Sequence, residues 1–579
     1  MIVHRIEPLD LHAHLFRVVL KVAEPGDLVR LTLPVWIPGS YLVREFARHV
    51  HGLEARQQGE RRTVRQLDKA SWEVKCTGRA PLEVEYRVYA FDVSVRAAYL
   101  DARRGFFNGT SMFLRVEGRE DEPQQVELRR LPRGWQTATS LPAVKVDARG
   151  QGLYQAADYD ELVDHPVELG HFWRGEFRAA GVPHEFVVSG ALPGFDAERL
   201  LADARRICET QIAFWHGRRR PPFSRYVFLL NAMDDAYGGL EHRASTALVC
   251  ARRDLPRRDE PGTPDAYVTL LGLISHEYFH TWNVKRLRPA EFARYDYSQE
   301  NYTELLWFFE GFTSYYDDLF LVRAGLIDEA RYLKLLAKAV NQVLATPGRQ
   351  LQSVAEASFD AWVKYYRPDE NTVNATVSYY TKGSLVALAL DLTLRREGAH
   401  LDDAMRALWQ ASGAGPISEA DIARALQEVG GRSYARELRR WVHGTQDLPL
   451  AELLEPFGVQ WQTQPAGWPQ RVGVRSHDTG GAVQIKSVMR GSAAERAGLA
   501  AGDEILAVGN WRLRKLEDLA LYASAGEPCE LLVSRDQRLL RLQLDVPAER
   551  EAHQVQLAVD PRASADRVAR RRAWLGPSR

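Results

Sequence analysis

The stretch SHEYFHTWNVKR, residues 275–286, constrains this chain more than any other. His276 and His280 are four residues apart, inside a run, YVTLLGLISHEYFHTWNV, whose apolar residues follow a helical spacing. Residues i and i+4 lie on the same face of a helix, so both imidazoles can point at one ion. Glu277 follows the first histidine, where it can reach a metal-bound water without ligating the metal. The pattern predicts a helix that supplies two ligands of a metal site.

The alternative is that the two histidines are ordinary core or surface residues, because this short motif also arises by chance. A catalytic zinc needs a third protein ligand and an open position for water. Glu310 fits, because it is a carboxylate within the aromatic run LLWFFEGFTSYYDDL, where a charge is costly to bury unless it is paired or binds a metal. We therefore predict one Zn²⁺ bound by His276, His280 and Glu310. Asp317 is expected to orient a zinc-bound histidine, with an ordinary surface aspartate as the alternative.

Composition limits the classes of protein and partner. A chain of 579 residues is too long for one core, so several domains are expected. Lys+Arg and Asp+Glu are equal at 76 each, which gives no reason to expect a nucleic acid or a membrane surface as partner. The four cysteines are scattered without a CxxC pair, which argues against cysteine-bound zinc and favours a reducing compartment. The N-terminus lacks the apolar core of a signal peptide, so we expect a cytoplasmic protein.

Changes of pattern along the chain predict a multidomain α+β protein. Alternation of polar and apolar residues, as in LEVEYRVYAFDVSVRAAYL, predicts an all-β domain over residues 1–180. Helical patterns dominate the second part, residues 181–465, which contains the histidine motif. The stretch QTQPAGWPQ is typical of a linker and precedes a compact segment with short strands, residues 471–547. The basic tail, residues 548–579, is expected to present its arginines to solvent.

Two motifs together support a resemblance to a known family. HEYFHTW followed by WFFEGFTSYY resembles the gluzincin zinc metallopeptidases, and specifically the glycyl aminopeptidase family with a C-terminal PDZ domain. VWIPGSYLVREFARHV, SFDAWVKYYRPDEN and VSYYTKGSLVALALDL are also similar to stretches of that family, so the resemblance covers nearly the whole chain. It implies a thermolysin-like catalytic domain with a helical extension, and peptide substrates with a free N-terminus.

The resemblance also implies a mechanism. Zinc lowers the pKa of its bound water to about 7, and Glu277 would take the proton from that water and return it to the leaving amine. The tetrahedral intermediate needs a further donor to its oxyanion. Tyr380, in YTKG, matches the tyrosine that has this role in aminopeptidase relatives, and its neighbour Tyr379, as a packed aromatic, is the alternative.

Substrate choice is expected at GGLEH, residues 238–242. In the relatives this motif lies on an edge strand of the cleft, and its glutamate binds the free α-amine of the substrate. The resemblance thus makes Glu241 the amine anchor, with Gly238 and Gly239 allowing the peptide backbone to approach. The alternative is a turn glutamate after paired glycines. His242 departs from the asparagine that is common in the relatives, which leaves open how the amine is held.

Residues 481–513, GAVQIKSVMRGSAAERAGLAAGDEILAVGNWRL, resemble a PDZ domain of the bacterial protease type. PDZ domains take a peptide C-terminus by strand addition, with loop amides holding its carboxylate. Val472, Gly473 and Val474 are the nearest match to that loop. The domain can equally be a structural lid packed on the catalytic domain.

Three functions are weighed. The leading one is a zinc-dependent aminopeptidase that removes N-terminal Gly or Ala. The second is a zinc endopeptidase whose PDZ domain captures substrate C-termini, and the third is a PDZ binding protein with an inactive site. The sequence carries no signal for an oligomeric state or for one physiological substrate.

Overall fold

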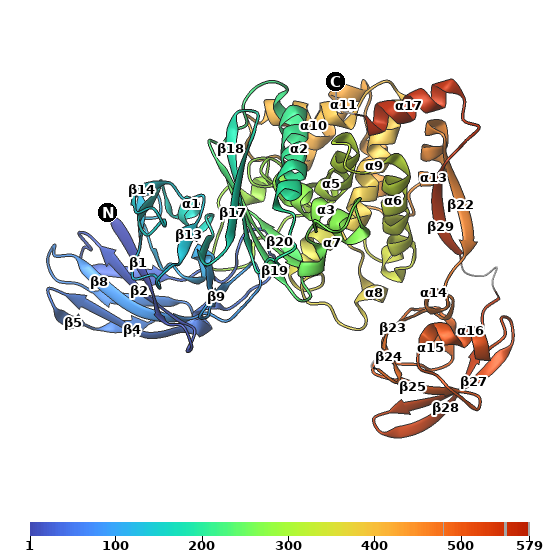
Figure 1. Ribbon diagram of the computed structural model, residues 1–579, viewed down its shortest axis with the longest axis horizontal. Coiled ribbons are helices and arrows are strands. Elements are labelled where there is room, and N and C mark those ends of the chain that lie inside the picture. The colour runs from blue at the N-terminus through green and yellow to red at the C-terminus, as the bar shows by residue number, and fades with distance from the viewer. Residues whose placement is uncertain (479, 549–552, 577–579) are drawn as a thin grey trace.

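The computed structural model describes residues 1–478, 480–548 and 553–576. Figure 1 shows a β-rich N-terminal region at one end of the molecule, a helical centre, and a small β-rich region at the other end. This arrangement confirms the fold class predicted from the sequence. Within the described residues, no helix combines the length and apolar character needed to cross a membrane.

The N-terminal region is built around one large sheet. Strand β8 (Leu82–Tyr89) buries every second residue, as the alternation in the sequence predicted. The eight strands run in the order β14 (Ala143–Val146), β15 (Gly152–Ala156), β12 (Gln124–Leu128), β1 (Ile2–Asp10), β2 (Leu15–Val22), β8, β4 (Val50–Gln57) and β5 (Glu60–Arg62).

Two four-stranded sheets complete this region. One has the order β13 (Gln136–Ala138), β16 (Val167–Gly170), β10 (Arg104–Phe107) and β9 (Ala98–Leu100), and the other β11 (Arg115–Val116), β3 (Leu28–Thr32), β7 (Ser71–Lys75) and β6 (Val64–Gln66). The short helix α1 (Tyr159–Val163) follows β15 and begins at the side chain of Asp158, which accepts from the Glu161 N–H.

A five-stranded mixed sheet lies between the N-terminal region and the helices. Its order is β17 (Trp173–Ala179), β18 (Val182–Ser189), β19 (Tyr226–Met233), β21 (Ser245–Ala251) and β20 (Tyr237–Glu241). β20, which carries the GGLE sequence, pairs only with β21 among the strands that the structure describes, and so forms an edge of this sheet. β17 begins before residue 180 yet pairs with β18, so it joins this sheet and not the sheets of the N-terminal region. The helix α2 (Ala197–His216) packs on β17.

The helical centre carries the two metal-site motifs. Its helices are α3 (Asp265–Phe279), α4 (Leu306–Phe309), α5 (Gly311–Arg323), α6 (Glu329–Leu344), α7 (Val354–Phe359), α8 (Thr372–Ala375), α9 (Thr381–Arg396), α10 (Leu401–Ala411), α11 (Glu419–Gly430), α12 (Ala435–Trp441) and α13 (Leu450–Leu454). α11 begins with a capping box of Ser418 and Asp421 and ends at Gly431 in the left-handed region.

Glycines bring α5 and α9 together. A Cβ atom on Gly311 would lie 2.6 Å from the Cα of Gly383, so any side chain there would push the two helices apart. This close approach places Tyr380, just before α9, near Glu310, just before α5.

The third region is inserted between two paired strands. β22 (Val459–Pro465) and β29 (His553–Val559) form an antiparallel ribbon, with Pro465 opposite His553. Between them lies the sheet β23 (Val474–Asp478), β24 (Val483–Val488), β25 (Glu504–Val508), β27 (Pro528–Arg535) and β28 (Arg538–Asp545), with the helices α14 (Trp468–Val472), α15 (Ala493–Arg496) and α16 (Leu519–Tyr522). It has a hydrophobic core of its own.

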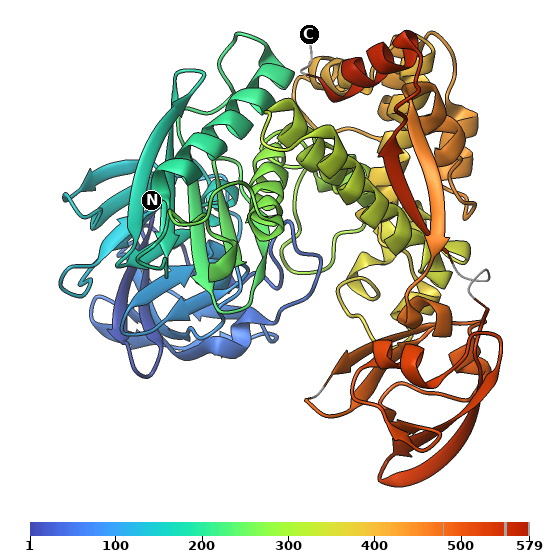
Figure 2. The ribbon, with the colours of Figure 1, turned by 45° about the vertical axis from the view of Figure 1, so that its right-hand side comes forward.

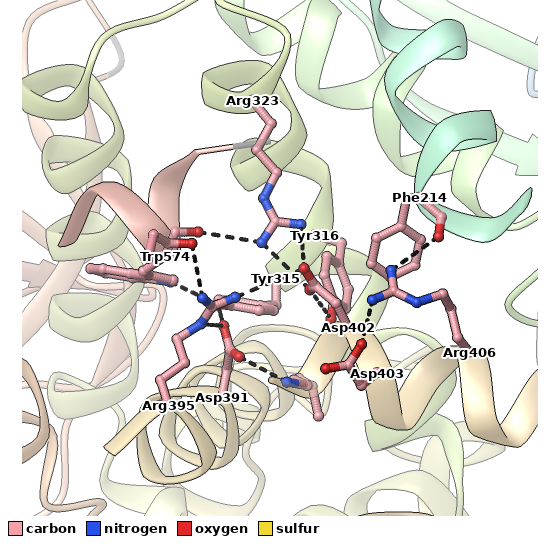
Figure 3. Close-up of polar contacts among 12 residues, drawn as sticks. Phe214, Tyr315, Tyr316, Arg323, Asp391, Arg395, Asp402, Asp403, Arg406 and Trp574 are labelled. Carbon is pink, nitrogen blue, oxygen red and sulfur yellow. Dashed lines mark hydrogen bonds and ion pairs between the residues drawn. The ribbon is translucent and has the colours of Figure 1, made fainter. Parts of the chain in front are cut away.

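After β29 the chain returns to the helical centre as α17 (Ala565–Leu575). Figure 3 shows Trp574 of this helix at a cluster of charged and tyrosine side chains. The Trp574 Nε1–H donates to the Tyr315 hydroxyl at 2.9 Å, and Arg323 donates to the Trp574 carbonyl at 3.3 Å. The expectation of a solvated arginine run holds for Arg570 and Arg572, whereas Arg571 is buried. The C-terminal helix thus supports α5, the helix that follows Glu310.

Candidate active site

The three predicted metal ligands lie together. His276 is in the last turn of α3, His280 ends that helix, and Glu310 lies between α4 and α5. Their ligand atoms are all within 4.8 Å of one another. Glu310 Oε2 lies 3.1 Å from His280 Nε2 and 3.6 Å from His276 Nε2. Two imidazole nitrogens and one carboxylate oxygen are a donor set that suits a catalytic zinc with an open fourth position.

Each histidine is oriented through its other ring nitrogen. His276 Nδ1 lies 3.0 Å from Asp317 Oδ2, a contact that the predicted orienting role of Asp317 requires. His280 Nδ1–H donates to the carbonyl of Asn283 at 2.8 Å. Both contacts leave the Nε2 atoms directed at the ligand cluster, and such partners fix the tautomer and the ring orientation of a metal-binding histidine. The sequence did not reveal the Asn283 contact, because a backbone carbonyl carries no residue-type signal.

Glu277 faces the edge strand β20. A Cβ atom on Gly239 would lie 2.2 Å from Glu277 Oε1, so only glycine lets the strand approach this carboxylate. Burial raises the pKa of Glu277 to about 7, while His276 and His280 act in the opposite direction. A carboxylate with a pKa near neutrality can both take and return a proton, which suits the predicted role as general base.

Tyr380, and not Tyr379, lies beside the ligand cluster with its side chain partly exposed. Its ring stacks on that of His276, with centroids 6.3 Å apart and an angle of 25° between the rings. Tyr379 is fully buried and packs against Tyr365 and Tyr380. The Tyr380 hydroxyl is 3.5 Å from that of Tyr366, which the sequence motifs had not singled out.

Glu241 ends the edge strand β20 with a buried side chain. One of its oxygens lies within 4.8 Å of ligand atoms of Glu277 and His280. Burial raises the pKa of Glu241, and the nearby Glu310 adds to this, whereas His280 and Lys285 oppose it. Glu241 Oε1 has no hydrogen-bond partner among the described residues. A buried carboxylate oxygen of this kind is suited to receive a cation such as an ammonium group.

The N-terminal region contacts the Glu241 carboxylate through Gly39. Gly39 belongs to the turn after Ile37 and has a φ of +92°, where only glycine is unstrained. A Cβ atom on Gly39 would lie 2.4 Å from Glu241 Oε1. The Gly39 carbonyl also accepts from the Tyr366 hydroxyl at 3.3 Å. Gly39 gives no signal in sequence for this role, because the contact joins residues 202 positions apart.

His242 is buried, and its imidazole contacts the N-terminal region. Its Nδ1–H donates to Asp164 Oδ1 at 3.1 Å. Lys285 Nζ lies 2.7 Å from the same oxygen. The sequence singled out His242 but gave no reason to connect it with Asp164 or Lys285.

The three residues predicted for a PDZ loop run from the last residue of α14 (Val472) through Gly473 to the first residue of β23 (Val474). Val472 and Val474 have buried side chains in the core of the inserted domain. Gly473 has a φ of +83°, and its carbonyl accepts from the Met489 N–H at 2.9 Å. β23 pairs only with β24 among the described strands, so no described strand occupies its outer edge, the place where a PDZ domain adds a peptide strand.

Comparison with known families finds a match for each of three successive parts of the chain. Residues 4–171 match the Peptidase M61 N-terminal domain, residues 269–386 the M61 glycyl aminopeptidase, and residues 484–535 a PDZ domain. Among solved structures, an aminopeptidase N family protein from Idiomarina loihiensis is 38% identical, with 100% of both chains covered and a TM-score of 0.94. An M1 zinc metallopeptidase from Deinococcus radiodurans is 16% identical, with 78% of this chain and 94% of that chain covered and a TM-score of 0.48. The search of curated proteins gives no match.

Proposed function

The chain belongs to the M61 glycyl aminopeptidase family, a family of metallopeptidases, and from that premise we propose that it is a zinc-dependent enzyme that removes N-terminal glycine or alanine from peptides. One observation carries the proposal. The buried Glu241 Oε1 has no hydrogen-bond partner among the described residues, and a carboxylate oxygen of Glu241 lies within 4.8 Å of ligand atoms of Glu277 and of His280, one of the three candidate metal ligands. A substrate amine at Glu241 would leave the first carbonyl group at the metal site.

His276, His280 and Glu310 would hold the ion. Zinc, when bound, supplies a Lewis acid that activates water and polarises the scissile carbonyl. The Glu277 carboxylate takes a proton from the attacking water and returns it to the leaving amine. The Tyr380 hydroxyl donates a hydrogen bond to the oxyanion that develops on the substrate.

The glycines around the pocket support a preference for small residues. Gly39 lies against Glu241, and Gly239 lies against Glu277, each too close for an added Cβ atom. The backbone at Gly39 and Gly239 therefore closes directly on the Glu241 and Glu277 carboxylates, and we infer that so tightly packed a site favours a small first substrate residue.

A panel of amino-acid amides tests the proposal. Glycine and alanine amides should be hydrolysed, leucine amide should be slower, and N-acetylglycine amide should not react because Glu241 then meets no ammonium. A chelator should abolish the activity, and zinc should restore it. Glu277→Gln should lower kcat by about 10²- to 10⁴-fold while the protein still binds one zinc ion. Equal turnover of the acetylated and free amides would contradict an aminopeptidase.

An endopeptidase that uses its PDZ domain to hold substrate C-termini is the second candidate. The unpaired edge of β23 favours it, because such an edge can add a peptide strand. Removing the inserted domain should then slow cleavage of proteins more than cleavage of short peptides. A PDZ binding protein without catalysis is the third candidate, and it requires that no zinc binds or that Glu277→Gln changes nothing.

We also propose a cytoplasmic location. It is supported by the four cysteines, which are all free thiols, as expected for a protein of a reducing compartment.

A further inference from the structure

The Asp164 carboxylate, from the N-terminal region, binds the turn that follows Glu241, the proposed amine-binding residue. Asp164, at the end of α1, accepts from His242 Nδ1–H at 3.1 Å and from the backbone N–H of Arg243 at 3.0 Å. His242 is directly bonded in sequence to Glu241. Two consecutive residues after the anchor are thus held by one side chain, which limits how the Glu241 carboxylate can move.

The same carboxylate neutralises a buried lysine. Lys285 is 5% exposed, and its Nζ lies 2.7 Å from Asp164 Oδ1. Its backbone N–H donates to the carbonyl of His280, a predicted metal ligand, at 3.0 Å. Asp164 and Glu241 both raise the pKa of Lys285, although burial alone would lower it. The ammonium group of Lys285 therefore lies in the field of two carboxylates, Asp164 and Glu241.

The position of this lysine matters for a substrate amine. Lys285 and the substrate would both bring an ammonium group to Glu241, so the two positive charges compete for one carboxylate. Asp164 draws Lys285 to itself through a short ion pair. A buried charge that loses its partner must find another, because leaving it unpaired costs free energy. Besides Asp164, Glu241 is the other carboxylate that raises the pKa of Lys285.

We propose that Asp164, His242 and Lys285 form a positioning cluster for the substrate α-amine, in which Asp164 holds Lys285 away from Glu241 and fixes the turn that carries it. The proposal rests on the proposed function, since it assumes that Glu241 binds the amine. The positioning cluster gives His242 a role at the place where relatives commonly have asparagine. The imidazole N–H of His242 binds Asp164 of the N-terminal region and not the substrate. The N-terminal region thereby takes part in amine recognition.

Two metal-binding probes that differ only in the amine test this cluster. Glycine hydroxamate and acetohydroxamate carry the same zinc-binding group, and only the first has an amine for Glu241. The ratio of their Kd values, measured by calorimetry on the zinc-loaded protein, isolates amine recognition. Asp164→Asn should reduce that ratio by about 10- to 100-fold, as expected for loss of an orienting partner, and should leave the Kd of acetohydroxamate unchanged.

Ser140→Ala is the matched control. The Ser140 hydroxyl, also from the N-terminal region, donates to Ser245 Oγ at 2.9 Å in the same turn, but it carries no charge. This variant should keep the wild-type ratio. The double variant with Asp164→Asn and Lys285→Met should regain much of the ratio, because the competing ammonium is then gone. A purely structural role of Asp164 would not give this recovery.

The outcomes separate this inference from the proposed function. A wild-type ratio near one would contradict amine binding at Glu241 and so the proposed function itself. A large wild-type ratio that Asp164→Asn leaves unchanged, or an equal loss of affinity for both probes, would overturn the positioning cluster alone. If Asp164→Asn does not fold, His242→Asn takes its place, since it keeps the Asp164–Lys285 pair. It should lower the ratio by a smaller factor, and an unchanged ratio would overturn the proposal.

Discussion

The two β-rich regions of this protein relate to the helical centre in different ways. The core of the N-terminal region is continuous with the mixed sheet, because it includes Leu229 of β19, Leu240 of β20 and Val249 of β21. The inserted PDZ domain has a separate core within residues 472–546. Figure 2 shows this domain reached through the β22–β29 ribbon. The N-terminal region therefore shares its core with the sheet that carries Glu241, whereas the PDZ domain folds around a core of its own.

Polar contacts follow the same division. The N-terminal region places Gly39 against Glu241 and Asp164 against His242. The PDZ domain meets α8 through Asn374, whose side chain donates to the Val488 carbonyl and accepts from the Arg490 N–H, both at 2.8 Å. The two flanks of the catalytic domain thus have similar secondary structure but different contacts with the candidate active site, so we expect catalysis to depend more on the N-terminal region than on the PDZ domain.

Deleting each region in turn is the strongest test of this contrast. Removing residues 1–172 should leave no folded, active protein, because the apolar faces of β19, β20 and β21 would meet water. Replacing residues 466–552 by Asn-Gly should join Pro465 to His553 as a tight hairpin. That variant should still unfold in one cooperative thermal transition and keep its glycine amide kcat/KM within about threefold of the full-length protein, because changes distant from a site have little effect on it. If the variant without the PDZ domain lost both its fold and its activity, the two β-rich regions would not differ in their importance for the enzyme.

A pair of glycine substitutions applies the contrast to single residues. Gly39→Ala adds strain at a φ of +92° and a Cβ atom 2.4 Å from Glu241 Oε1, so KM for glycine amide should rise at least about tenfold and stability should fall by about 1–3 kcal/mol. Gly491→Ala in the PDZ domain has a similar φ of +74° with nothing within 4 Å of the added atom. It should cost about 1 kcal/mol of stability and leave the kinetics unchanged. Equal effects on KM would contradict the account.

Acid should lower the stability of the N-terminal region, because His4 must then take up a proton in a buried position. Burial lowers the pKa of His4 from 6.5 to about 4, so the folded protein keeps this imidazole neutral while the unfolded chain binds a proton. Stability is therefore lost as the pH falls from about 6.5 to about 4, by up to about 3 kcal/mol. His4→Phe keeps an aromatic ring next to Phe113 and should reduce this loss. Thermal unfolding of both proteins at pH 7.5 and 5.0 measures it, and an equal acid loss in the variant would contradict the assignment.

The smallest effect is expected at the PDZ contact. Asn374→Ala removes two hydrogen bonds, each of which contributes about 1 kcal/mol. Hydrogen exchange at residues 488–490 should become faster, while turnover of glycine amide stays the same. A large drop in turnover would show that the PDZ domain supports the active site directly.

The candidate metal site could be predicted from sequence because its signals are local. His276 and His280 share one helical face, and Glu310 is a charge within an aromatic run, so spacing and residue type identify them. Tyr380 and Glu241 required a resemblance to known enzymes, since a tyrosine or a glutamate in a loop is common. The family and the fold class expected from these residues are confirmed.

The remaining features depend on contacts between distant parts of the chain. Asp164, His242 and Lys285 meet only through the packing of three regions, and no pattern within one element marks them. The insertion of the PDZ domain depends on the pairing of Pro465 with His553, across a complete domain. Trp574 was part of an apparently basic tail, and its burial against Tyr315 became visible only in three dimensions.

A crystal structure of zinc-loaded Glu277→Gln protein with triglycine bound tests the central claim most directly. The account predicts the peptide's α-amine within about 3 Å of the Glu241 carboxylate, with its first carbonyl oxygen between the metal and the Tyr380 hydroxyl. A peptide that crosses the site with its N-terminus beyond Glu241 would contradict the account and favour an endopeptidase.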